Sequence, residues 1–161
     1  MITVRRAGDL DAREMAQLLN EIIHIGGTTA YTEDVSAETI KNWLRKSPDQ
    51  AVWHVAEDAS GTILGFQYIK PNTALPPEAC DIATFVRVSQ TGLGIGSKLF
   101  DKTAQAARLS GYKWINATIR ADNESGLTYY QSRGFEYYAT QKNVALGSGL
   151  IVDKISKRFD L

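Results

Sequence analysis

An amide and a phenol seven residues apart are the first side chains in this sequence that could do chemistry. Asn123 and Tyr130 lie in a short segment that is closed by Gly134 and Phe135. About thirty residues earlier stands a glycine cluster, Gly92-Leu93-Gly94-Ile95-Gly96-Ser97. A glycine-rich turn that opens a helix can bind phosphate through its free backbone N–H groups. Together the two segments indicate a site for a phosphorylated ligand with polar side chains at its edge.

The elements around the glycines are those that a phosphate-binding turn needs. The run 81–88 is rich in β-branched residues and predicts a strand. From Ser97 to Gly111, small and apolar residues recur at helical spacing. Glycine at every second position of the turn lets the backbone approach a ligand closely. A second strand is predicted over 112–119, so strand, turn, helix and strand form one βαβ unit with parallel strands.

Other interpretations compete for the same residues. A Walker P-loop needs four residues between its first glycine and a Gly-Lys-Ser/Thr sequence, and the chain has no such spacing. A dinucleotide fingerprint needs a glycine where Ser97 stands and an acid about twenty residues on, so it is nearly matched but poorly supported. A helix that simply follows a flexible glycine loop is the plainest alternative. Likewise, Asn123 could be an ordinary helix N-cap and Tyr130 a packed core residue.

The two motifs taken together resemble those of the GNAT acyltransferase superfamily. Its second motif, Asn-x-x-Ala-x-x-aromatic-Tyr-x-x-x-Gly-Phe, is matched except that Gly126 replaces the usual alanine. In its first motif, Gln/Arg-x-x-Gly-x-Gly/Ala, the glycines match, but Thr91 stands where Arg or Gln is expected and Gln90 is adjacent. The resemblance covers residues 81–140. It implies that the backbone amides of the turn bind the pyrophosphate of acetyl-CoA.

The resemblance also implies which residues bind the cofactor and which act in catalysis. The expected contacts to acetyl-CoA are Phe85, Val86, Thr91, Gly92, Leu93, Gly94, Ile95, Gly96, Ser97, Asn123 and Tyr130. The backbone N–H near Val86 would polarise the thioester carbonyl. Tyr130, with a pKa somewhat lowered by the site, would protonate the CoA thiolate, and Asp81 would accept the amine proton directly or through water. An exposed carboxylate at a strand start is the other interpretation of Asp81.

A further resemblance concerns the acceptor. The segment 27–33, Gly-Thr-Thr-Ala-Tyr-Thr-Glu, is similar to the N-terminal region of phosphinothricin and methionine sulfoximine acetyltransferases. It implies that Thr29, Tyr31 and Glu33 contact a small-molecule amine, an amino acid or an analogue, which attacks acetyl-CoA directly in a ternary complex. Two alternatives stay open. One is an acetyltransferase for protein N-termini or lysines, and the other is a non-catalytic acyl-CoA-binding regulatory module.

The composition predicts one globular domain over residues 1–161. With 43% hydrophobic and 22% charged residues, the chain is typical neither of disordered nor of membrane proteins. Its 18 basic and 18 acidic residues balance, so nothing favours binding to nucleic acid or anionic lipid. A single cysteine, Cys80, is expected just before the strand and suits a reducing cytoplasm. Two distant histidines and one cysteine form no metal motif. We therefore expect a cytoplasmic protein without a metal, and a homodimer remains open.

The remaining pattern predicts an α+β fold of mixed α/β type. Strands are expected over 2–6, 51–57, 62–69, 81–88, 112–119, 135–140 and 150–159, and helices over 10–25, 36–47, 97–111 and 123–134. This amounts to an about seven-stranded, mostly antiparallel sheet with one parallel pair and about four helices. The resemblance implies the same GNAT-like acyl-CoA N-acyltransferase fold.

Overall fold

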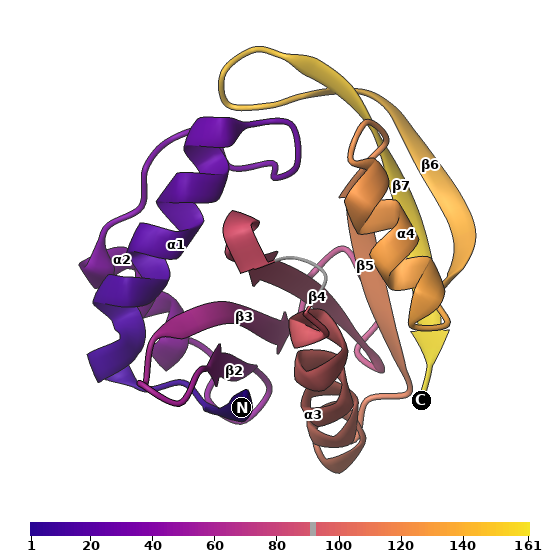
Figure 1. Cartoon of the computed structure of the whole chain (residues 1–161). Coiled ribbons are helices and arrows are strands. Elements are labelled where there is room, and N and C mark those ends of the chain that lie inside the picture. Colours follow the sequence, from indigo (N-terminus) through magenta and orange to yellow (C-terminus); the bar gives the residue numbers. More distant parts are fainter. Residues whose placement is uncertain (91–92) are drawn as a thin grey trace.

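The computed structural model describes residues 1–90 and 93–161. Within these ranges seven strands form one sheet in the order β1-β2-β3-β4-β5-β7-β6, flanked by four α-helices (Figure 1). The strands are β1 (Thr3–Arg6), β2 (Val52–Glu57), β3 (Ile63–Lys70), β4 (Ala79–Val86), β5 (Trp114–Arg120), β6 (Glu136–Ala145) and β7 (Ile151–Asp160). The helices are α1 (Ala12–Ile25), α2 (Ala37–Arg45), α3 (Ile95–Leu109) and α4 (Glu124–Ser132). The predicted fold class is confirmed.

The sheet is antiparallel except at its centre. There β4 and β5 run parallel, with α3 as the connection, which confirms the predicted parallel pair. The two strands pair only at 79–81 with 114–116. Further along, β5 is paired with β7 alone over its remaining length. The central sheet is therefore split between β4 and β5 beyond Asp81.

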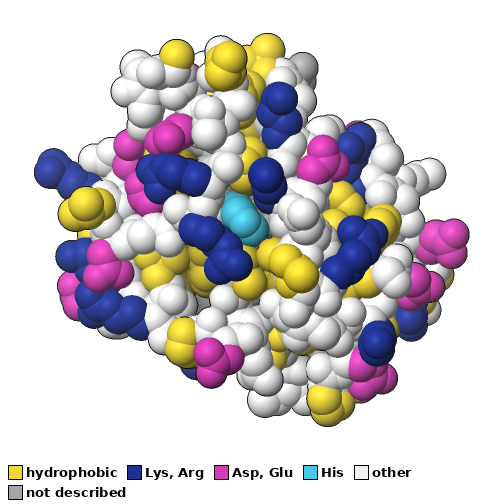
Figure 2. All heavy atoms as spheres, turned by 90° about the horizontal axis from the view of Figure 1, so that it is seen from below, with side chains coloured by type: hydrophobic (Ala, Val, Ile, Leu, Met, Phe, Trp, Pro, Cys, Tyr) yellow, Lys and Arg dark blue, Asp and Glu magenta, His cyan; other side chains and the backbone are white. Residues whose placement is uncertain are grey.

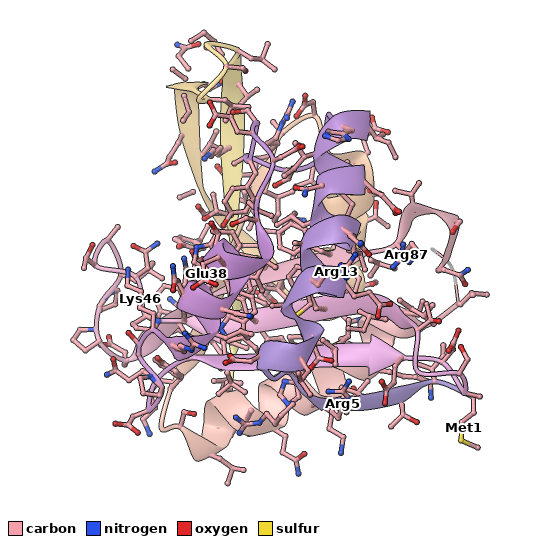
Figure 3. All side chains as sticks on the ribbon, turned by 90° about the vertical axis from the view of Figure 1, so that its left-hand side faces the viewer. Met1, Arg5, Arg13, Glu38, Lys46 and Arg87 are labelled. Carbon is pink, nitrogen blue, oxygen red and sulfur yellow. The ribbon has the colours of Figure 1, made fainter. Side chains whose placement is uncertain are left out.

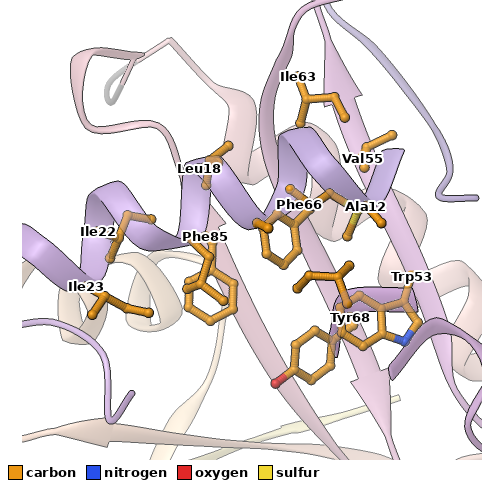
Figure 4. Packing of buried hydrophobic residues seen from close by; sticks show 14 residues of the cluster. Ala12, Leu18, Ile22, Ile23, Trp53, Val55, Ile63, Phe66, Tyr68 and Phe85 are labelled. Atoms are coloured by element: carbon orange, nitrogen blue, oxygen red, sulfur yellow. The ribbon is translucent and has the colours of Figure 1, made fainter. Parts of the chain in front are cut away.

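Helices cover both faces of the sheet. α1 and α2 pack over β2 and β3 in a cluster that includes Phe66, and Figure 4 shows Leu18 of α1 and Phe85 of β4 in this core. α3 packs on the other face, where Leu99 joins a separate cluster with Ala56. Because side chains alternate along a strand, neighbouring residues of β2 supply both cores.

The end of β4 is fastened to α1 by Arg87. Its guanidinium donates to the Ile63 carbonyl at 3.0 Å and to the Glu21 carboxylate at 3.1 Å. Figure 3 shows Arg87 beside α1. A partly exposed ion pair of this kind contributes about 0–1 kcal/mol, so it orients the strand end more than it stabilises the fold.

Several element boundaries differ from the sequence prediction. β4 begins at Ala79, so Cys80 is a buried strand residue, and burial raises the pKa of its thiol to about 12. β4 ends at Val86 because 88–90 form one 3-10 turn instead. α3 starts at Ile95 rather than at 97, and β6 continues to Ala145 because its backbone pairs with β7 despite mostly polar side chains.

The surface carries balanced charge. Figure 2 shows basic and acidic side chains interspersed over the face seen from below. His54 is a packed core histidine: burial, helped by Arg6 and Lys102, lowers its pKa to about 4. Among the residues that the structure describes, no helix has the length and apolar character needed to cross a membrane.

Candidate functional site

A cleft of about 1460 Å³ opens where β4 and β5 separate. Its walls come from the strands β3 to β7, from the loop between α1 and α2, and from the first turns of α3 and α4. The predicted site residues in these walls are Thr29, Tyr31, Asp81, Phe85, Val86, Gly94, Ile95, Gly96, Ser97, Asn123 and Tyr130. The two motifs and the N-terminal loop, which are far apart in sequence, thus meet in one space.

Two predicted residues that the structure describes do not line the cleft, and two others are not described. Glu33 is exposed on the loop between α1 and α2, outside the cleft. Leu93 is 57% exposed and also lies outside the lining. Thr91 and Gly92 fall outside the described residues.

The split in the sheet leaves a backbone donor facing the cleft. The Arg87 N–H donates to the Leu64 carbonyl of β3 at 2.8 Å. Since N–H groups along a strand point alternately to either side, the Val86 N–H is directed to the opposite edge, where β5 has separated. Such a donor can stabilise a developing oxyanion.

Gly94 gives the turn before α3 its shape. It is the helix N-cap with a φ of +76°, in the left-handed region that favours glycine. An added Cβ there would meet no atom within 4 Å. Ile95, Gly96 and Ser97 follow in the cleft wall, and the N–H groups of this first turn have no partners within the helix. The turn can therefore hold an anion.

Gly96 has a different structural reason from the one that the sequence suggested. A Cβ at this position would lie 2.6 Å from the ring of Tyr129, and the Tyr129 hydroxyl donates to the Gly96 carbonyl at 2.7 Å. This glycine therefore permits a close approach to α4. The contact fastens the turn before α3 to the helix that carries Tyr130.

Asn123 joins α4 to the loop between α1 and α2. Its Oδ1 accepts from the Gly126 N–H at 3.0 Å as the N-cap of α4, and its Nδ2 donates to the Thr28 carbonyl at 3.1 Å. A Cβ at Gly126 would lie 2.9 Å from the Asn123 Cγ. In this chain the asparagine side chain occupies the space that an alanine methyl group at 126 would need.

Tyr130 is almost fully buried at the cleft. It is 7% exposed, and its hydroxyl lies 2.8 Å from the Thr84 Oγ1. Burial raises the pKa of this phenol well above its ordinary value, although the hydrogen bond with Thr84 opposes the shift. The expectation that the site lowers the Tyr130 pKa is therefore wrong, because removal of water outweighs the one polar partner.

Asp81 sits at the point where β4 and β5 separate. Burial raises the pKa of its carboxyl, while hydrogen bonds from Asn116 at 2.9 Å and Asn72 at 3.3 Å oppose the shift. The Asn116 Oδ1 in turn accepts from the Tyr138 hydroxyl. The carboxylate is half-buried rather than an exposed residue at the strand start, and a raised pKa suits a group that accepts protons near neutral pH.

Tyr31 and Thr29 form the wall opposite the glycine turn. The Tyr31 ring stacks on Trp43 at a centroid distance of 5.5 Å, and its hydroxyl lies 3.5 Å from that of Tyr68. The Thr29 carbonyl accepts from Arg120 at 3.1 Å. The loop is thus held in place from both ends, by aromatic packing and by a cation of β5.

The β6–β7 hairpin supplies a further wall of the cleft. Figure 1 shows it reaching across the molecule toward the top of α1. At its tip, a Cβ on Gly147 would lie 2.9 Å from the Thr32 Oγ1, so the hairpin is in contact with the loop between α1 and α2.

The described residues hold no group of three or more His, Cys, Asp or Glu that could bind a metal. The exposed His24 contacts Asp34 at 2.5 Å, outside the cleft.

Several cleft residues were not predicted from the sequence. Thr84, Asn116 and Arg120 all line the cleft. Thr84 precedes Phe85 on β4, and Arg120 is the last residue of β5. Only the separation of these two strands shows that Thr84 neighbours Tyr130 and that Arg120 neighbours the loop between α1 and α2. Asn116, a polar residue in a buried strand, was the one available signal.

Comparisons with known proteins agree with this geometry. A phosphinothricin N-acetyltransferase of Streptomyces coelicolor is 28% identical over 148 residues, which cover 89% of this chain and 86% of that protein. A phosphinothricin acetyltransferase from Sinorhizobium meliloti, solved in complex with acetyl-CoA, superposes with a TM-score of 0.88 at 20% identity, over 99% of this chain and 88% of that one. A ribosomal-protein-alanine N-acetyltransferase from Brucella melitensis gives a TM-score of 0.90 at 23% identity, over 99% of both chains.

The model of the GNAT acetyltransferase family matches residues 14–135. The match spans the loop between α1 and α2, the glycine turn and the segment from Asn123 to Phe135. The chain is therefore a member of the GNAT acetyltransferase family.

Proposed function

We propose that this protein moves the acetyl group of acetyl-CoA to the amine of a small molecule, an amino acid or an amino acid analogue. The amine attacks the thioester directly in a ternary complex. The observation that carries the proposal is that one cleft is lined both by the turn at Gly94–Ser97 and by the loop residues Thr29 and Tyr31. Donor and acceptor can meet there without a covalent enzyme intermediate.

Attack begins with a neutral amine. An amine of pKa near 10 is only about 0.1% neutral at pH 7, a deficit of roughly 4 kcal/mol. Asp81 would take up the proton, but it lies four residues before Phe85, which is next to the proposed oxyanion donor at Val86. Four residues are about 13 Å along an extended strand. The proton therefore reaches the carboxylate through water. The oxyanion that forms on the thioester carbonyl would accept from the Val86 N–H.

Collapse of the tetrahedral intermediate breaks the C–S bond and leaves a thiolate. Tyr130 donates its phenolic proton toward the sulfur as that bond breaks. Since a phenol is a weaker acid than a thiol, and burial makes Tyr130 weaker still, the phenol acts mainly as a hydrogen-bond donor to the forming thiolate. Asn123, as the N-cap of α4, keeps this tyrosine in register with the cleft.

The loop between α1 and α2 supports a small acceptor over a protein. Thr29 and Tyr31 of this loop line the cleft, and Thr32 of the same loop contacts the tip of the β6–β7 hairpin at Gly147. The relatives named as phosphinothricin acetyltransferases point the same way. An acetyltransferase for protein N-termini remains the outcome to test against.

The test measures release of free CoA thiol with acetyl-CoA and three pools: amino acids including phosphinothricin and methionine sulfoximine, polyamines, and peptides. We expect turnover with the amino acid pool, and a loss of kcat of roughly 10²–10⁴ in Tyr130→Phe with CoA affinity unchanged by calorimetry. Tyr112→Phe is the matched control, because it removes a buried hydroxyl that donates to the Gln50 carbonyl at 2.8 Å away from the cleft. Turnover of peptides alone overturns the proposal.

A further inference from the structure

A row of polar side chains crosses the acceptor side of the cleft. Arg120 of β5 pairs in register with Lys154 of β7, and Lys154 pairs with Gln141 of β6. All three residues line the cleft. Because directly opposite residues on neighbouring strands share a face of the sheet, the two cations lie side by side.

Arg120 is held rigidly in this row. The side chain is 7% exposed, and its guanidinium donates to both carboxylate oxygens of Asp122, at 3.0 and 2.7 Å, and to the Thr29 carbonyl at 3.1 Å. Three of the five N–H groups of an arginine are thereby used, so two stay available to a ligand. A planar guanidinium fixed in this way suits recognition of a carboxylate.

Lys154 adds a second cation to the row, and its side chain has no partner among the described residues. Asp122 pairs with Arg120, whereas the Lys154 side chain is half-buried and makes no ion pair or hydrogen bond with any described residue. Its neighbour Asp153 is engaged elsewhere, with Lys142 and the Asn143 N–H. A partly desolvated cation without a partner favours an anionic ligand.

The row faces the acceptor and not the phosphates of CoA. Along β5, Asn116 and Arg120 line the cleft on the face that carries Asp81, whereas Ile115 packs in the cluster of Phe100 of α3 on the opposite face. The glycine turn that begins α3 therefore approaches the ligand from the other side.

The row also lines the same cleft as the backbone donor at Val86. Asp81 and Asn116 are register partners, and four further residues lead to Phe85 on β4 and to Arg120 on β5. Although the two strands separate beyond this pair, Arg120 and Val86 both lie toward the carboxyl ends of their strands. An anionic group a few bonds away from the attacking amine would reach the row.

From this arrangement we infer that Arg120 and Lys154 form a carboxylate subsite, so that the acceptor carries a carboxylate close to its amine. The inference rests on the proposed function and specifies its substrate class. It distinguishes an α-amino acid from a peptide N-terminus, whose neighbouring carbonyl is an uncharged amide.

The experiment compares one acceptor with its own carboxamide. The amino acid of the panel that turns over fastest is paired with the derivative in which –CONH₂ replaces –COO⁻, and KM is measured for the wild type and for Lys154→Met. We expect the substitution to raise KM for the carboxylate at least tenfold, with kcat within about twofold and KM for the carboxamide unchanged. Each acceptor is compared with itself, so the different pKa values of the two amines cancel.

Two further variants complete the test. Lys154→Arg keeps the charge and should restore most of the affinity, and Lys142→Met, on the neighbouring strand and outside the cleft lining, should leave both KM values unchanged. Equal effects of Lys154→Met on carboxylate and carboxamide, or no effect on either, overturn the subsite while the acetyltransferase proposal stands. Failure of every amine to react overturns the proposed function itself.

Discussion

The Thr84 hydroxyl and the Tyr130 phenol are hydrogen-bonded at 2.8 Å, which links a residue of β4 to the proposed acid of α4. The Gln67 Nε2 donates to the same Thr84 oxygen at 2.8 Å and to the Tyr129 hydroxyl at 3.0 Å. The Tyr129 hydroxyl in turn donates a hydrogen bond to the Gly96 carbonyl. Because Thr84 accepts from Gln67, its own hydroxyl proton can be donated to Tyr130, and in that arrangement the phenolic proton is available to a ligand in the cleft. This series of hydrogen bonds thus prepares Tyr130 to act as a hydrogen-bond donor.

Removal of the Thr84 hydroxyl should make Tyr130 a less effective donor. Thr84→Val keeps the shape of the side chain, so we expect kcat to fall roughly tenfold, equivalent to about 1.4 kcal/mol, because the developing phenolate loses a hydrogen bond. KM for acetyl-CoA should change little. Thr84→Ser restores the donor and should recover most of kcat in steady-state assays. A parallel loss in the serine variant would show that only packing matters at this position.

The glycine turn allows a test with a matched control. Gly94 and Gly61 both have φ near +80°, and an added Cβ would meet nothing within 4 Å at either site. Valine at each position therefore imposes similar backbone strain, but only Gly94→Val places atoms in the cleft. We expect it to weaken CoA binding at least tenfold by calorimetry, while Gly61→Val binds normally. Equal affinities of the two variants for CoA would show that the turn at Gly94 takes no part in CoA binding.

Much of the fold followed from the sequence because its signals are local. The helix predicted over 36–47 is α2, which Ser36 caps by accepting from the Thr39 N–H, and the turn at 58–61 joins the two predicted strands that form β2 and β3. The cofactor half of the site is coded in the same local way, by glycines and by Asn123 at a fixed spacing. Residues in a short continuous motif are brought together by one turn and one helix.

The acceptor half could not be predicted in the same way. Arg120, Lys154 and Tyr31 come from three distant segments, and only the pairing of β5 with β7 and the packing of the loop bring them together. The sequence also did not indicate how deeply Tyr130 is buried. The pKa of Tyr130 rises instead of falling because the ring is enclosed in the core, which the motif around it does not encode.

At Gly126, substitution by alanine should destabilise the protein rather than stabilise it. In a helix, Gly→Ala normally stabilises by about 1 kcal/mol. Here the new Cβ would lie 2.9 Å from the Asn123 Cγ and displace the side chain that caps α4 and holds Thr28. Loss of a cap costs about 1 kcal/mol, and loss of the second bond adds to it. We expect Gly126→Ala to lower Tm by a few degrees in calorimetry. A rise in Tm would mean that Asn123 moves aside without loss.

The raised pKa of Asp81 gives catalytic activity and protein stability opposite dependences on pH. As a base it must be ionised, so kcat/KM of the wild type should fall as pH drops through a value above the ordinary pKa of about 4. For stability the sign is reversed, because the folded state holds the proton more tightly than the unfolded chain. The stabilisation is therefore present below the unfolded pKa and is lost as pH rises through the folded one.

Asp81→Asn should separate these two effects. Above the Asp81 pKa, where the wild-type carboxylate is ionised, the rate should fall most at the lower pH values, at which the amine is most fully protonated, and raising the pH should partly restore it as the amine loses its proton unaided. Over the same range, the Tm of the variant relative to the wild type should rise with pH, since the variant has no charge to bury. The control is Asp153→Asn, an acid on β7 outside the cleft lining, which should shift neither profile. A rate loss that is the same at every pH, with the Tm difference still changing, would leave Asp81 a buried acid that takes no part in proton transfer.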